Sequence, residues 1–125
     1  SGTMHVVHRR DGEERTLVAH VEPVDSLRSR VGGLARLAVR DDYGLVFEFG
    51  SVGDRRASTV ATPLALDVVW TENGEVTNVA RLPRWTGTAR GTGDRVFEFS
   101  GGVVQNVRLG DELVTSQAQS SRSTE

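Results

Sequence analysis

The chain contains no cysteine, no lysine and no isoleucine among its 125 residues. Without cysteine there is no disulfide framework, no thiolate zinc site and no cysteine nucleophile. Without lysine there is no Schiff-base chemistry, because all 15 Lys-or-Arg positions are arginine, whose guanidinium stays protonated near neutrality. Valine and leucine fill the branched apolar positions, a usage typical of a GC-rich genome.

Long hydrophobic runs are also missing. No stretch approaches the roughly 18 apolar residues needed to cross a bilayer, and the first three residues, which we interpret as a cloning remnant before Met4, carry no signal-peptide core. The net charge of -2 creates no field that would gather nucleic acid or an anionic membrane. We expect a cytoplasmic protein with no membrane segment, and nucleic acid is not the expected partner.

The length predicts one domain, because a chain of this size buries about two-thirds of its unfolded surface around one core. We place this β-rich domain at residues 4–116. Residues 117–125 hold no large apolar side chain and are predicted to form a disordered tail.

Short apolar and β-branched runs separated by turn signals predict a mainly β fold. Asp11-Gly12 and Asn73-Gly74 are hairpin turn signals, lying between strands expected at 4–10 and 15–21, and at 64–71 and 75–82. Further strands are expected at 45–49, 57–61, 85–90, 95–99 and 112–115. The stretches 50–56 and 91–93 are expected to be loops, and 101–109 a single helical turn.

One helix is expected after Pro23. Leu27, Val31 and Leu34 recur at helical spacing, and Asp25 or Ser26 can cap the first turn. Gly32-Gly33 predicts that this helix is short or frayed. The fold class is therefore mainly β with one short helix: a small barrel-like or strongly coiled mixed or antiparallel sheet, with the helix capping or covering one side.

A family resemblance rests on the order of several short motifs: Arg30-x-x-Gly33-Leu34, Gly44-Leu45-Val46-Phe47, Leu66-Asp67-Val68-Val69-Trp70, Val96-Phe97-Glu98-Phe99-Ser100-Gly101 and Gly110-Asp111. In these the chain resembles the family called domain of unknown function 192 over about residues 6–114, and is most similar to its halophilic-archaeal branch. The resemblance implies a compact, barrel-like β domain with a short helix, and no established activity. It also implies methionines where Ala35 and Thr59 stand, so a pocket lined by those positions would be wider or more polar here.

The resemblance concentrates at residues 30–35 and 59–67, which we expect to face each other. The candidate ligand-binding residues are Arg30, Leu34, Ala35, Thr59, Thr62, Asp67 and Glu98. Arg30 is a possible bidentate partner for Asp67, although Asp67 also fits an ordinary structural hydrogen bond. Glu98 and Glu48 occupy equivalent places in two Val-Phe-Glu-Phe strands, where facing solvent is the simpler interpretation of both.

Other constellations point to structure before chemistry. His5, His8 and His20 fall in the first hairpin, where a metal pair is conceivable but exposed or partly buried histidines are expected. Trp70 is expected in the core and Trp85 half-covered, which leaves little for a base-stacking surface. We find no nucleophile elbow, no dinucleotide or phosphate-binding glycine pattern and no metal motif.

These observations favour a non-enzymatic module that binds a small ligand or a protein partner, with no cofactor and no catalytic residue assigned. The alternative is an enzyme that acts on a carbohydrate-like substrate through Asp67 with Arg30 or Glu98. We expect a monomer or a weak homo-oligomer.

Overall fold

The computed structural model describes residues 4–117, which form eight strands and one helix. The strands are β1 (Met4–Arg10), β2 (Glu13–Val18), β3 (His20–Pro23), β4 (Tyr43–Ser58), β5 (Leu66–Glu72), β6 (Glu75–Leu82), β7 (Thr88–Ser100) and β8 (Glu112–Gln117). The helix α1 (Leu27–Leu37) lies between β3 and β4. The predicted class, mainly β with one short helix, is confirmed.

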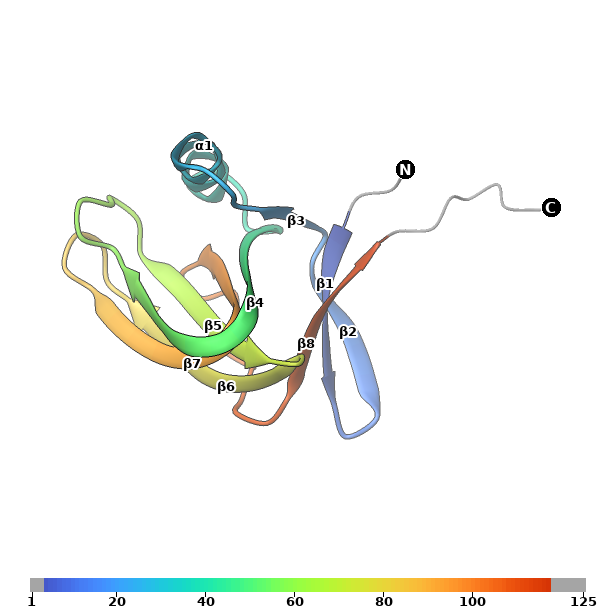
Figure 1. The fold of residues 1–125 in the computed structure, drawn as a ribbon. Coiled ribbons are helices and arrows are strands. Elements are labelled where there is room, and N and C mark those ends of the chain that lie inside the picture. Colours follow the sequence, from blue (N-terminus) through green and yellow to red (C-terminus); the bar gives the residue numbers. More distant parts are fainter. Residues whose placement is uncertain (1–3, 118–125) are drawn as a thin grey trace.

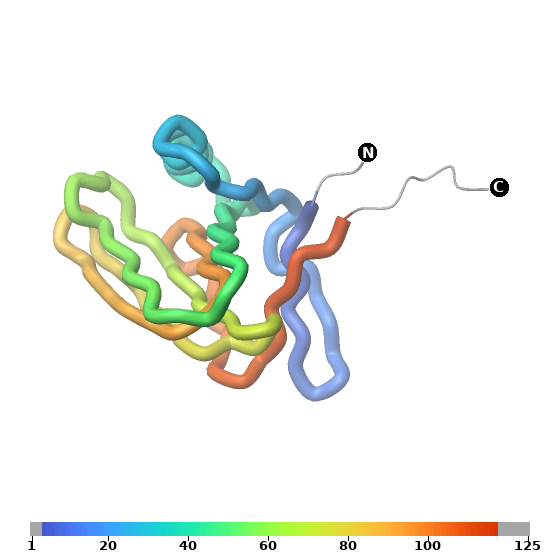
Figure 2. Tube along the Cα trace, in the orientation of Figure 1, coloured from blue at the N-terminus to red at the C-terminus, as the bar shows by residue number. Residues whose placement is uncertain are grey.

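All eight strands belong to one open, strongly curved mixed sheet in the order β2-β1-β8-β6-β5-β7-β4-β3 (Figure 1). Every pairing is antiparallel except β3 with β4, which is parallel. The strand β1 pairs along its length with β8, so segments from the two ends of the described chain lie side by side, as the trace in Figure 2 also shows.

The helix begins where the sequence predicts, but it continues past the expected point of fraying. Ser26 is the N-cap, and its hydroxyl accepts a hydrogen bond from the amide of Ser29. The helix is short, as expected, but it does not fray at Gly32-Gly33, because it continues through both glycines to Leu37. A Cβ on Gly33 would lie 2.3 Å from a methyl group of Leu45, so glycine here lets the helix approach β4 closely. Within residues 4–117 no helix is long and apolar enough to span a membrane.

The stretches 50–56 and 91–93 are not the expected loops, because they lie within the long, bent strands β4 and β7. The register between these strands shifts between Glu48 and Gly53, which absorbs the extra residues of the bend. A Cβ on Gly91 would lie 2.6 Å from the ring of Trp70. The glycines are needed where the bent sheet closes on Trp70, so they mark close packing within strands.

Four further expectations need correction. The second strand is interrupted at Ala19, which separates β2 from β3. Trp85 makes only an isolated bridge to Val60 before β7 begins at Thr88, and residues 101–106 form successive turns without a helix. Gln117 belongs to β8, while the rest of the predicted tail (118–125) and the predicted cloning remnant (1–3) lie outside the described residues.

The side chains of the sheet divide into two buried clusters on its two faces. The first contains Val69, Phe97 and Phe99 and is covered by the turns at 101–107; the second contains Leu45, Val68 and Trp70 and is covered by α1 through Leu34 and Leu37. Alternation along β5 and β7 decides which side chains reach the helix-covered face.

Candidate functional site

The most unusual polar group of the helix-covered face is the carboxyl of Glu98 on β7. Its side chain is only 3% exposed, and its atom Oε1 is buried without a hydrogen-bond partner. Glu98 stands opposite Leu45 on β4 and Val68 on β5, so aliphatic side chains flank it. Burial therefore raises the pKa of Glu98, and the positive charge of Arg30 partly offsets that rise.

Arg30 reaches the same place from the helix. Its Nε is also buried without a hydrogen-bond partner, and none of its nitrogens lies within 4.0 Å of a Glu98 oxygen. The two opposite charges therefore attract each other across a gap without forming an ion pair. Unpaired buried polar atoms are costly and uncommon in folded proteins, and each needs an explanation.

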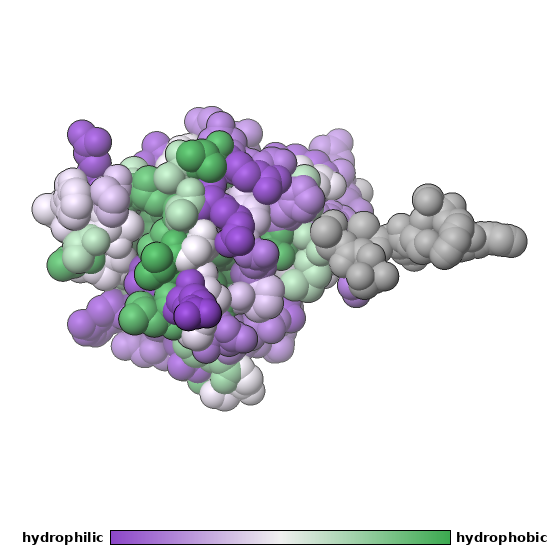
Figure 3. Space-filling view, turned by 90° about the horizontal axis from the view of Figure 1, so that it is seen from above, coloured by the Kyte–Doolittle hydropathy of each residue, from purple (hydrophilic) through white to green (hydrophobic). Residues whose placement is uncertain are grey.

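Both side chains line a pocket of about 270 Å³. Phe47, Phe49, Ala57 and Val96 supply apolar walls, and Arg56 and Ser58 join Arg30 and Glu98 as its polar lining. The bend in β4 brings both halves of that strand to the pocket. Figure 3 views the molecule from the side of α1 and shows apolar and charged side chains adjacent on this face.

The seven residues predicted to bind a ligand are only partly brought together. Arg30 and Glu98 meet at the pocket, and Leu34 packs against the apolar cluster beneath the helix. Ala35 is exposed and does not line the pocket. Thr59 and Thr62 are buried elsewhere: the Thr59 hydroxyl accepts from the amide of Gly87 at 2.8 Å, and the Thr62 amide donates to the Thr59 carbonyl.

Asp67 lies on the opposite face from Glu98, because its side chain shares the face of Val69 and Phe99. It accepts hydrogen bonds from Arg81 Nε at 2.8 Å and from the backbone amides of Gly102 (2.8 Å) and Val104 (3.0 Å). The predicted pairing with Arg30 is therefore wrong, and the carboxyl instead anchors the turns at 101–106. This is the structural hydrogen bond that the sequence left open.

The solvent-facing interpretation holds for Glu48 and is wrong for Glu98. Glu48 is exposed and pairs with Arg95 at 3.0 Å, and it faces the opposite side of the sheet from Glu98. The strand register makes the difference, because Glu48 stands opposite Arg95 and Glu98 opposite Leu45 on the other face, although the two local sequence patterns are the same. The sequence also missed Phe47, Phe49 and the 56–58 segment as pocket residues, because 50–56 was expected to be a loop.

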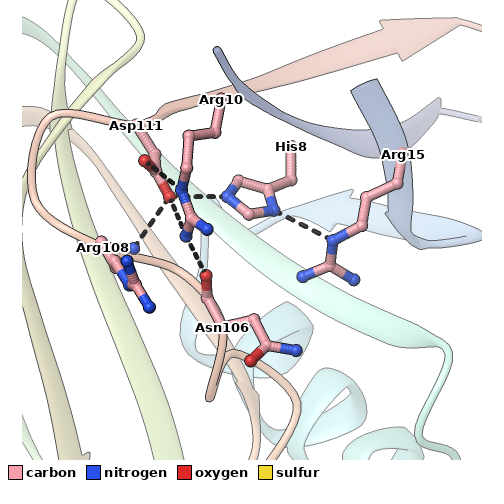
Figure 4. Close-up of polar contacts among 6 residues, drawn as sticks. All are labelled: His8, Arg10, Arg15, Asn106, Arg108 and Asp111. Carbon is pink, nitrogen blue, oxygen red and sulfur yellow. Dashed lines mark hydrogen bonds and ion pairs between the residues drawn. The ribbon is translucent and has the colours of Figure 1, made fainter. Parts of the chain in front are cut away.

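A second polar cluster joins the first hairpin to the turn before β8 (Figure 4). Asp111 accepts hydrogen bonds from Arg10 Nε at 3.0 Å and Nη2 at 2.9 Å, from His8 Nε2 at 2.7 Å and from the amide of Arg108 at 2.9 Å. The Arg10 hydrogen bonds are the main cause that holds the pKa of Asp111 far below its usual range, and the hydrogen bonds from His8 and the Arg108 amide act in the same direction. Arg10 also donates to the Asn106 carbonyl.

His8 is buried, which corrects the expectation of exposed or partly buried hairpin histidines for this residue. Its Nδ1 lies 3.0 Å from Arg15 Nε. Because a guanidinium only donates, Nδ1 accepts and Nε2 carries the proton given to Asp111. Both ring nitrogens are thus occupied, so this cluster offers neither a free base nor a metal ligand, and it is a structural tie.

The larger hollow beside this cluster, about 650 Å³, has charged walls that already pair with each other, as in Arg9 with Glu14 and Glu112.

Trp70 is fully buried and donates from Nε1 to the Arg55 carbonyl, while Trp85 is 53% exposed. The predicted core position of Trp70 is confirmed. Among the described residues, three side chains hold a buried polar atom without a hydrogen-bond partner, and two of them, Arg30 and Glu98, line one pocket.

Comparison with known proteins identifies the fold. The model of the family DUF192, described as uncharacterized ACR, matches residues 6–115. A crystal structure from Sinorhizobium meliloti 1021, described as a candidate transcription regulator, is similar with a TM-score of 0.71 and 23% identity over 92% of this chain and 95% of that one. A protein of unknown function from Novosphingobium aromaticivorans DSM 12444 is similar with a TM-score of 0.72 and 18% identity, over 88% and 83% of the two chains. At these identities the likeness shows the fold alone. No curated protein matches the chain.

Proposed function

Since the chain belongs to the domain of unknown function 192 family, whose membership brings a fold without an activity, we propose its function from the pocket itself: a non-enzymatic module that binds a small molecule between Arg30 and Glu98. One observation carries the proposal. Two oppositely charged side chains line one pocket without pairing with each other, and each also holds a buried polar atom that has no hydrogen-bond partner. A bound molecule that hydrogen-bonds to both would remove the cost of leaving them unpaired.

Binding is favoured over catalysis because of what lines the pocket. Glu98 is the one carboxyl among the described lining residues, whereas glycoside hydrolysis ordinarily uses two carboxyls on either side of the bond. Asp67, the second carboxyl of the enzyme alternative, faces the other side of the sheet and is engaged by three donors. The unpaired side chains of Arg30 and Glu98 offer hydrogen bonds to a small molecule in this pocket, whereas no feature described above favours a protein partner.

The test is a ligand screen that reports the place of binding. Two-dimensional ¹H–¹⁵N NMR spectra of the protein are recorded with mixtures of sugars, amino acids, nucleotides, carboxylic acids and amides. We expect at least one compound to shift the amide signals of β4 and β7 around the pocket, and the shift to be lost in Arg30→Gln and Glu98→Gln. Arg28→Gln on the same helix and Glu48→Gln on the equivalent strand position are matched controls that should bind normally.

Any of three results would reject this function. Shifts that appear only elsewhere would move the site away from the pocket. Shifts at the pocket that survive both Arg30→Gln and Glu98→Gln would show that the unpartnered atoms do not bind the ligand. A screen without any pocket shift would likewise remove the small-molecule function for the classes included.

Three narrower proposals accompany this one. We propose that the chain acts in the cytoplasm and is a monomer or weak homo-oligomer. Light scattering across a concentration series would check the oligomeric state. We also propose that it comes from the halophilic-archaeal branch of the family. If so, its thermal midpoint should rise strongly between 0.1 M and 3 M salt, and a flat salt response would count against that branch.

A further inference from the structure

The gap between Arg30 and Glu98 restricts the chemistry of any molecule that fills it. The guanidinium of Arg30 can only donate, and the ionised carboxylate of Glu98 can only accept. A bridging group must therefore accept from the first and donate to the second. A single hydroxyl oxygen does both, and with hydrogen bonds of about 2.8 Å at an angle of about 110° it bridges atoms about 4.6 Å apart. That reach is consistent with a separation beyond 4.0 Å.

The charges of the pocket select against ions of either sign. An anion would be attracted by Arg30 and Arg56 but would lie beside the buried carboxylate of Glu98, which no described residue neutralises through an ion pair. A cation would lie beside two guanidinium groups. Bringing either ion next to the buried carboxyl of Glu98 adds a desolvation cost, so a neutral molecule meets the fewest unfavourable contacts.

The walls and the size narrow the class further. Phe47, Phe49, Ala57 and Val96 offer apolar surface to carbon atoms, while Ser58 and Arg56 add polar groups at the same pocket. Several hydroxyl groups on a carbon ring can use more of these partners than a single amide can. At about 270 Å³ the pocket is below the roughly 300–1,000 Å³ typical of drug-sized ligands, so it fits one ring better than an oligosaccharide or a nucleotide.

We propose that this pocket binds a neutral hydroxylated ring molecule of about monosaccharide size, with one hydroxyl group bridging the Arg30 guanidinium and the Glu98 carboxylate. The inference rests on the proposed binding function and names its ligand class. The ring carbons pack against the phenylalanine side of the pocket, and the remaining hydroxyls reach Ser58 and Arg56.

The experiment compares four ring compounds of similar size by NMR titration. They are cis-cyclohexane-1,2-diol, cyclohexanol, cyclohexanecarboxylate and δ-valerolactam, and a panel of neutral pentoses and hexoses is titrated in parallel. We expect the diol and at least one sugar to shift the amide signals around the pocket, with cyclohexanol weaker than the diol because it has fewer hydroxyl groups. Affinity for the sugar should fall at least tenfold in Arg30→Gln and Glu98→Gln and stay within twofold in Arg28→Gln and Glu48→Gln.

The outcomes separate the ligand class from the binding function. If the carboxylate or the lactam binds in the pocket with the same dependence on Arg30 and Glu98, while the diol and sugars do not, the hydroxyl class is overturned and the binding function stands. If no compound of either screen shifts the pocket signals, both fall. The spectrum of each variant verifies its fold directly, and Arg30→Gln, which replaces a helix side chain, tests the site independently should Glu98→Gln unfold the sheet.

Discussion

Replacing Glu98 by glutamine should make the unliganded protein more stable near neutral pH, although it removes a charged group from a charged pocket. Burial raises the pKa of Glu98 and Arg30 offsets this only in part. A carboxyl whose pKa is higher in the folded than in the unfolded state supports folding below the unfolded value, and that support is lost as the pH rises through the folded value. At pH 7.5 the glutamate therefore costs stability relative to a neutral isostere.

The magnitude follows from the burial and the missing partner. An unsatisfied buried polar group costs roughly 1–3 kcal/mol, and glutamine recovers only part of this because its amide stays polar. We expect Glu98→Gln to raise the free energy of unfolding by about 1 kcal/mol at pH 7.5, or the thermal midpoint by about 3–5 °C for a domain of this size. At pH 4, where the glutamate is protonated, the two proteins should differ much less.

Urea unfolding followed by tryptophan fluorescence at both pH values measures the effect, because Trp70 is fully buried in the folded state. Glu48→Gln is the matched control: that carboxylate is exposed, so its loss should change stability by less than about 0.5 kcal/mol. A Glu98→Gln variant that is destabilised at pH 7.5, or whose effect is the same at both pH values, would refute the argument. It would mean that the carboxylate is held favourably by Arg30.

Three other substitutions test the structural ties. Asp67→Ala should lower the free energy of unfolding by roughly 2–4 kcal/mol and free the turns at 101–106, seen as faster amide exchange there, since it removes the acceptor of two backbone amides and one guanidinium; unchanged exchange would contradict this anchor. Asp111→Asn should destabilise by a similar amount at pH 7, and the difference from the parent should shrink only in strong acid, because a carboxyl with a lowered pKa stabilises above its unfolded value and loses that effect as the pH falls through its folded value. Gly91→Ala should cost about 1–3 kcal/mol in urea unfolding through the clash with Trp70, and a neutral result would show that the strand can move aside.

Features set by local chemistry were predictable from the sequence. Asp11-Gly12 and Asn73-Gly74 were expected as hairpin turns, and all four residues have positive φ angles between 50° and 87°. The Ser26 cap was one of two residues expected to start the helix. In each case the deciding interactions lie within a few residues, so the local sequence is enough to predict the feature.

Features set by long-range packing were not predictable in the same way. The glycine at position 91 resembles a turn residue until the ring of Trp70 is placed against it. Glu48 and Glu98 share one local pattern, but only the second comes under α1. The sequence did include Arg30 and Glu98 among its candidates. It could not show that they face each other without pairing, which depends on the bend of β4 and the position of the helix.

The short interruption at Ala19 has a consequence for how the molecule opens. The strands β2 and β3 form the two outermost positions of the sheet, yet they follow each other directly along the chain. Detachment of one edge strand is therefore expected to loosen the other, and β2 and β3 should open as one cooperative unit. Protection of their backbone amides against solvent deuterium should then decay together, although the two strands lie at opposite edges of the sheet.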